Sequence, residues 1–157
     1  MGHAEISPIG IDSFILRDSW PLGPERMISC EERYRMSQKE AFESYRARMN
    51  QRLTELDNRI IKRVFSVDSL AYEPGALDRS TKELIGLVAS LVLRCDDCVR
   101  YHLNQLDREG PSQEAIIEAL GIGLVVGGTI VIPHLRRAID YLDELKGAAQ
   151  PPPLESA

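Results

Sequence analysis

The chain has 157 residues, and its acidic balance already excludes several classes of partner. Because 24 Asp and Glu residues outnumber 19 Lys and Arg residues, the formal net charge is −5, and nothing favours binding to nucleic acid or to an anionic membrane. The length fits one domain, or one domain with an extension. Three cysteines are too few for a secreted disulfide framework, so we expect a reducing, cytoplasmic compartment.

No segment predicts export or insertion into a membrane. The start of the chain lacks a basic segment followed by an apolar run, so we expect no signal peptide. The longest apolar stretch, residues 119–133, is short for a bilayer span and contains four glycines.

Residues 1–36 form the first expected unit, an arm without sustained periodicity. Prolines and glycines interrupt it, which predicts a loop with at most a short helical turn. Phe14 and Trp20 are candidates to anchor this arm on the core or on another subunit. Cys30 has no partner nearby in the sequence, so we interpret it as a bystander.

Residues 37–70 form a second unit, whose pattern predicts a long amphipathic helix. Ser37 and Glu40 have the spacing of a capping box, which marks the start of the helix. A single helix from Ser37 to about Val64 would be about 42 Å long, which is long for a domain of this size. Part of its apolar stripe is therefore a candidate surface for packing on a neighbouring subunit. The stripe has steps of three and four residues: Phe42, Tyr45, Met49, Leu53, Leu56, Ile60 and Val64.

The third unit, residues 71–147, contains four residues able to move protons or electrons: Glu83, Cys95, Cys98 and His102. On a helix, Cys95, Cys98 and His102 share one stripe. Glu83 precedes Cys95 by twelve residues, roughly 18 Å along a straight helix, and it joins the others only if the chain folds back. We expect a helical hairpin that turns near residue 93 and places Glu83 opposite His102.

Such a cluster suits the redox chemistry of thiols. A thiolate attacks a disulfide or a peroxide, and a helix N-terminus and a nearby imidazole both favour the thiolate. A second thiol one turn away can resolve the resulting mixed disulfide or sulfenic acid. His102 can move the proton, and Glu83 can fix its tautomer. Asp96 and Asp97 suit the first turn of a helix, although their charge opposes a neighbouring thiolate.

Three simpler interpretations remain open. Glu83 ends the pattern Ser80-Thr-Lys-Glu83, a second capping box, and capping could be its whole role. A Cys-x-x-Cys pair with a nearby histidine can also hold zinc, but no second pair of ligands occurs elsewhere, and we expect no metal. The two cysteines could also be buried apolar residues.

The five-part spacing Glu-x11-Cys-x-x-Cys-x3-His resembles the signature of the alkylhydroperoxidase D (AhpD)-like proteins, within the carboxymuconolactone decarboxylase superfamily. The flanking residues 75–85 and 110–119 also resemble that family, and the similarity covers about residues 70–145. This spacing is far more specific than a lone Cys-x-x-Cys.

The resemblance implies a role for each residue of the cluster. Cys98 would be the attacking cysteine and Cys95 its resolving partner, while His102 and Glu83 would form the proton relay. The implied enzyme uses no cofactor, and it takes a peroxide or disulfide substrate and a thiol electron donor. One position departs from the pattern, because the best-known peroxidase members have a second histidine where this chain has Asp97. This departure argues against efficient peroxidase turnover and leaves disulfide chemistry intact.

Decarboxylases of the superfamily lack the cysteine pair, so its presence argues against their activity. A lactone-decarboxylase-like lyase that uses His102 or His134 as acid or base remains the enzymatic alternative. A metal-binding or purely structural helical oligomer is the alternative from another class.

The remainder of the third unit predicts two more helices. Ser112 can cap the first, and Gly123 and Gly127, one turn apart, let another helix approach closely. Pro133 can begin the last helix, in which we interpret His134 as structural. Residues 148–157 read as a flexible tail.

We therefore predict an all-α protein, a bundle of five or six helices around a central antiparallel hairpin that contains the cysteines. The leading function is an AhpD-like thiol-disulfide oxidoreductase. Proteins of similar sequence are commonly trimers or hexamers, so we also expect a homo-oligomer of that size.

Overall fold

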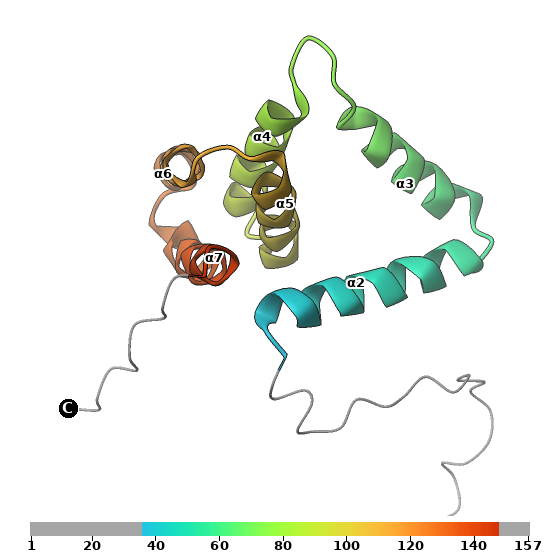
Figure 1. Ribbon diagram of the computed structural model, residues 1–157. Coiled ribbons are helices and arrows are strands. Elements are labelled where there is room, and N and C mark those ends of the chain that lie inside the picture. Colours follow the sequence, from blue (N-terminus) through green and yellow to red (C-terminus); the bar gives the residue numbers. More distant parts are fainter. Residues whose placement is uncertain (1–35, 148–157) are drawn as a thin grey trace, which may run out of the picture.

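The computed structural model describes residues 36–147, and this part of the chain is helical with no strand (Figure 1). This confirms the all-α prediction. The expected arm, with Phe14, Trp20 and Cys30, and the expected tail fall on residues 1–35 and 148–157, outside the described residues. The elements are α2 (Gln38–Glu55), α3 (Arg59–Ala71), α4 (Arg79–Val92), α5 (Asp96–Glu109), α6 (Gln113–Gly127), the short 3₁₀ helix η1 (Thr129–Val131) and α7 (Ile132–Leu145).

Helices α4 to α7 form a bundle in which α4 packs against α5 and α6, and α5 packs against α7. Gly123 of α6 packs closely against α4, because a Cβ there would lie 2.9 Å from Leu91 Cδ2. This confirms that a small residue in α6 admits a neighbouring helix. The fully buried core side chains include Leu87, Leu91, Leu103, Leu106, Ile116, Tyr141 and Leu142. Ile85, which belongs to the largely apolar surface of α4 that the sequence predicts to be buried, is 55% exposed instead.

The helix ends follow the sequence signals with one exception. Ser37 and Glu40 form the predicted capping box, and Ser112 accepts a hydrogen bond from the Ala115 N–H. Gly110 ends α5 in the left-handed conformation, with φ of 81°. The capping box predicted at Ser80 is wrong. Helix α4 begins earlier, because the Asp78 carboxylate accepts a hydrogen bond from the Thr81 N–H at 2.7 Å.

The single long helix expected from Ser37 to about Val64 is wrong, because the chain breaks between α2 and α3. Asp57 adopts a left-handed conformation with φ of 49°, which a continuous helix does not tolerate. The Asn58 side chain then accepts hydrogen bonds from the N–H groups of Ile60 and Ile61 and starts α3. The two helices diverge as the arms of a V beside the bundle (Figure 1). Neither contributes a buried residue.

None of the described helices is both long enough and apolar enough to cross a bilayer.

Candidate active site

A three-residue link between α4 and α5, Leu93 to Cys95, positions the cysteines. Arg94 adopts a left-handed conformation with φ of 60°, and the N–H groups of Arg94 and Cys95 donate to the carbonyls of Leu91 and Ser90. This pair of hydrogen bonds is a Schellman motif, which ends α4 and reverses the chain. The predicted turn near residue 93 is confirmed.

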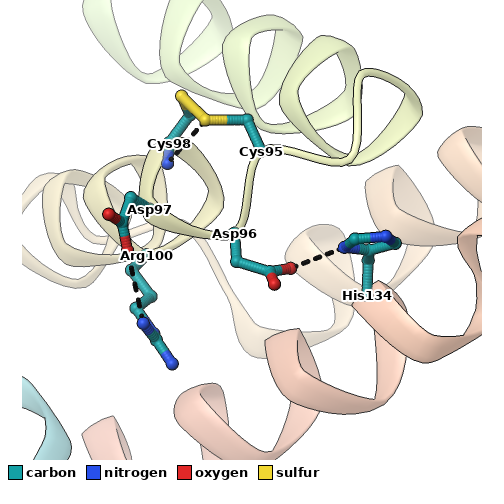
Figure 2. The surroundings of a disulfide bond; sticks show 6 residues. All are labelled: Cys95, Asp96, Asp97, Cys98, Arg100 and His134. Carbon is teal, nitrogen blue, oxygen red and sulfur yellow. Dashed lines mark hydrogen bonds and ion pairs between the residues drawn. A yellow bond between two sulfur atoms is a disulfide. The ribbon is translucent and has the colours of Figure 1, made fainter.

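Cys95 is both the N-cap of α5 and half of a disulfide with Cys98 (Figure 2). The Cys98 N–H donates to Cys95 Sγ at 3.3 Å. Cys98 is exposed, while Cys95 is only half-buried behind it. The two sulfurs therefore sit at the positive end of a helix dipole, where a thiolate is stabilised, and Cys98 is the one that an incoming molecule reaches more easily.

The two aspartates beside the cysteines are each paired with a basic side chain. Asp97 accepts from Arg100 Nη1 at 3.3 Å, and Asp96 lies 2.7 Å from His134 Nδ1 and 2.8 Å from Arg137 Nε (Figure 2 draws the Asp97 and His134 contacts). Burial opposes ionisation of Asp96, but the hydrogen bonds from His134 and Arg137 outweigh it and lower the pKa of its carboxyl. Because both aspartates are paired with basic side chains, Asp96 and Asp97 repel a neighbouring thiolate less than unpaired carboxylates would.

Glu83 and His102 meet across the hairpin, as predicted. His102 Nδ1 lies 2.7 Å from Glu83 Oε2, and both residues are buried, Glu83 completely. The other carboxylate oxygen, Oε1, lies 3.9 Å from Arg79 Nε. A carboxylate against Nδ1 orients the imidazole ring and favours a proton on that nitrogen. Because Asp78, and not Ser80, is the N-cap of α4, helix capping does not account for Glu83.

Gly86 makes room for the imidazole, and sequence reasoning missed it. A Cβ at this position would lie 2.5 Å from His102 Cε1 and 2.6 Å from the Tyr72 hydroxyl oxygen. Both side chains thus rest directly on the α4 backbone. The signal in the sequence was weak: Gly86 follows Glu83 by three residues, so it lies on the same face of α4.

A pocket of about 350 Å³ opens beside Cys98 and His102. Helix α2 supplies one wall and the end of α3 another, and neither wall was predicted. Arg46 lies over the Tyr101 ring, with 4.2 Å between the guanidinium carbon and the ring centroid. The lining residues are Phe42, Tyr45, Arg46, Met49, Asn50, Asp68, Tyr72, Asp97, Cys98, Tyr101 and His102.

Two tyrosines of this pocket remain protonated at neutral pH. Burial, and after it the charge of Glu83, raises the pKa of Tyr72 and of Tyr101. Their hydroxyls are therefore neutral donors close to His102, whose ring lies 5.6 Å from that of Tyr72 and 5.2 Å from that of Tyr101. Tyr101 could have been suspected from its place next to His102, but Tyr72 lies thirty residues away in sequence.

His134 lies near the cysteines but outside this pocket. It contacts Asp96, the residue after Cys95, and it ties the start of α5 to the start of α7. Between residues 36 and 147, no three His, Cys, Asp or Glu side chains are grouped so that they could hold a metal ion.

Comparisons with known proteins identify relatives of this chain. The sequence model of the carboxymuconolactone decarboxylase family matches residues 60–141. An uncharacterised protein of the cox locus of Paracoccus denitrificans is 31% identical over 83 residues, which are 53% of this chain and 75% of that protein. The chain belongs to the carboxymuconolactone decarboxylase family. The resemblance seen in the motif is thereby confirmed for the family.

Solved structures support the same assignment. Two crystal structures of a Thermotoga maritima protein match with TM-scores of 0.67 and 0.65 at 55% identity, over 68% of this chain and 94% and 91% of theirs. One of them is described as a carboxymuconolactone decarboxylase family protein with possible involvement in an antioxidative response. An apo member of the family from Legionella pneumophila, 24% identical, shares the fold with a TM-score of 0.57 over 68% of this chain and 92% of that protein.

Proposed function

We propose that this protein is a thiol-disulfide oxidoreductase of the AhpD-like type. One observation supports it above the others: an exposed Cys98 is bonded to Cys95 at the edge of a pocket that also contains His102, whose ring a buried carboxylate holds. The possible antioxidative role of the Thermotoga maritima relative points the same way.

With a disulfide substrate, the reduced protein acts in two steps. The Cys98 thiolate attacks one substrate sulfur, the substrate S–S bond breaks, and the first thiolate leaves and takes up a proton. The Cys95 thiolate then attacks Cys98 Sγ and releases the second thiolate. Two electrons pass from the protein to the substrate, which becomes two thiols while the Cys95–Cys98 bond forms.

With a hydroperoxide substrate, the same cysteines give a different first product. The Cys98 thiolate attacks the terminal oxygen, the O–O bond breaks, and the alkoxide that leaves takes up a proton to become an alcohol. Cys98 becomes a sulfenic acid, and the attack of Cys95 on it forms the disulfide and releases water. In either case an external thiol donor in a reducing, cytoplasmic compartment restores the two cysteines.

The proposed relay moves the protons that these steps require. His102 follows Cys98 by one turn on α5 and lines the same pocket, so its Nε2 is the candidate base for the Cys98 thiol. Glu83 holds Nδ1 and stabilises the imidazolium that forms.

Thiol stoichiometry tests the assignment of the two cysteines. Reduced protein that contains Cys30→Ser is mixed with a chromogenic aryl disulfide. With both cysteines present, we expect two aryl thiols released per chain. Cys95→Ser should release one aryl thiol and keep the other aryl group attached to Cys98 as a mixed disulfide. Cys98→Ser should release almost none. Equal reaction of the two single variants would contradict the assignment, and mass spectrometry identifies the modified residue.

A second test addresses the relay. Glu83→Gln keeps the shape of the side chain but removes its charge, so we expect the rate of Cys98 alkylation to fall about a hundredfold near neutral pH, with a changed pH profile. Ser80→Ala is the matched control, since Ser80 does not cap α4. Identical alkylation profiles for Glu83→Gln and wild type would remove Glu83 from the mechanism.

A further inference from the structure

Helix α3 presents an apolar face that nothing in the described chain covers. Ile60, Val64, Val67 and Leu70, here called the α3 stripe, are spaced by four, three and three residues and so share one face. Their side chains are between 62% and 71% exposed. Among the described helices, the main packing partner of α3 is α2. A continuous apolar stripe of this kind marks an interaction surface.

A second uncovered apolar surface lies between α4 and α6. It is a hollow of about 600 Å³ lined mainly by aliphatic side chains, and we call it the α4–α6 groove. Its most exposed members, Ile85, Leu93, Ile122 and Val126, are between 55% and 76% exposed. A groove lined by aliphatic side chains on two helices is suited to the apolar face of a third helix.

The chain cannot fill this groove with its own α3 in the described conformation. Helix α3 and helix α6 lie on opposite sides of the α4–α5 pair (Figure 1). The C-terminal end of α3 is also held to α4, where Lys82 Nζ donates to the Ala71 carbonyl at 2.9 Å. The same end places Asp68 and Tyr72 in the pocket beside Cys98.

Charge favours a second copy of the same chain as the occupant. Arg59 and Arg63 are exposed at the start of α3, next to the stripe. Glu114 and Glu118 are exposed on the first half of α6. Glu118, Ile122 and Val126 are spaced by four residues, so the acidic residues continue the edge of the groove. The charges pair if α3 lies parallel to α6, with Val64 opposite Ile122.

We propose that the α3 stripe of one copy docks in the α4–α6 groove of the next copy, parallel to α6. The two surfaces differ, so the contact is heterologous. Repetition of such a contact from copy to copy gives a closed assembly most simply as a ring. A trimer or hexamer built in this way would hold α3 at both ends. The neighbour would thereby fix the helix that supplies Tyr72 and Asp68 to each thiol pocket.

Directed cross-linking tests the contact. Two single variants, Val64→Cys and Ile122→Cys, are made in full-length chains whose native cysteines are replaced by serine, and are combined by coexpression. Under mild oxidation we expect a disulfide-linked dimer that contains one chain of each type, and no covalent dimer from either variant alone.

Each other outcome overturns the proposal. A covalent dimer from Ile122→Cys alone would indicate groove-to-groove pairing, and one from Val64→Cys alone would indicate stripe-to-stripe pairing. A linkage within one chain of the double variant would mean that α3 fills its own groove. The absence of any linkage, with a light-scattering mass near 17.6 kDa, would leave the groove to a different partner.

A charge exchange provides an independent test. We expect Arg63→Glu and Glu118→Arg each to reduce the mass measured by light scattering to that of one chain, and the double exchange to restore the oligomer. Arg136→Glu, at an exposed position of α7, is the matched control and should leave the mass unchanged. If both single variants keep the oligomeric mass, the proposed register is wrong.

Discussion

The α4–α7 bundle and the α2–α3 pair differ in how far they bury their apolar side chains. The bundle buries its leucines among its own helices, whereas neither α2 nor α3 contributes a single buried residue. The bundle contains all four groups of the proposed chemistry, while α2 and α3 supply only walls of the pocket. A region stabilised by its own core can hold reactive groups rigidly, and a region without a core depends on what it packs against.

The largest expected effect tests this difference directly. Leu91→Ala removes a fully buried side chain and should lower the free energy of unfolding by about 3 kcal/mol. Ile60→Ala in α3 should lower it by less than about 0.5 kcal/mol in dilute protein, since this side chain is exposed in the single chain. Urea unfolding measures both. Similar losses for the two variants would show that α3 is part of the same core.

A glycine exchange tests the rigidity of the site within the bundle. Gly86→Ala places a Cβ against His102 and Tyr72, so we expect a loss of about 2 kcal/mol together with slower Cys98 alkylation. Gly121→Ala in α6 meets no neighbour and should stabilise the protein by up to about 1 kcal/mol. Thermal unfolding and alkylation rates check the pair. An unchanged rate of Cys98 alkylation in Gly86→Ala would mean that the position of the His102 imidazole does not affect the reactivity of Cys98.

Loss of a helix cap should have different consequences in the two regions. Asn58→Ala frees two N–H groups of α3, and Ser112→Ala frees one of α6, each at a cost of about 1 kcal/mol. We expect the first to increase hydrogen exchange in α3 alone, and the second to lower the stability of the whole bundle. Uniform acceleration of exchange in Asn58→Ala would show that α3 unfolds together with the bundle.

The smallest effect concerns the contact between α5 and α7. Because the folded protein lowers the pKa of Asp96, the carboxylate stabilises the fold above its unfolded pKa of about 3.9 and loses this effect as the pH falls through the folded value. Asp96→Asn should therefore cost less than about 1 kcal/mol at pH 6, and the cost should shrink as the pH falls below the unfolded pKa. Melting temperatures measured from pH 6 into the acid range check it. A difference that does not shrink as the pH falls would have another cause.

The same division explains what the sequence could predict. In the bundle, the Glu83–His102 spacing and the helix-start residues Asp96 and Asp97 were enough to predict the hairpin, because local signals and burial agree there. In α2 and α3 the apolar periodicity continues across Leu56 and Ile60, and it concealed the break at Asp57. Apolar periodicity indicates which side of a helix is suited to burial. In α2 and α3 the described part of a single chain does not bury that side.

The pocket was beyond sequence reasoning for a related reason. Gly86 matters only because the His102 ring, from another helix, lies against it. The spacing of residues along the sequence does not reveal a contact between two helices. The walls from α2 depend on the direction that the chain takes after Glu55, which the break at Asp57 sets. The reactive groups were predicted because they lie on one hairpin.

The match to the family begins at residue 60, so it includes the sulfurs and the relay but not Phe42, Tyr45, Arg46 or Met49 of the pocket wall. The residues of the proposed chemistry thus lie inside the matched stretch, whereas the α2 wall of the pocket lies outside it. Under the proposed function, we expect substitutions in α2 to change which molecules reach Cys98 while the cysteines and the relay stay in place. Exchange of α2 for that of a relative is a direct way to test whether this helix sets the selectivity.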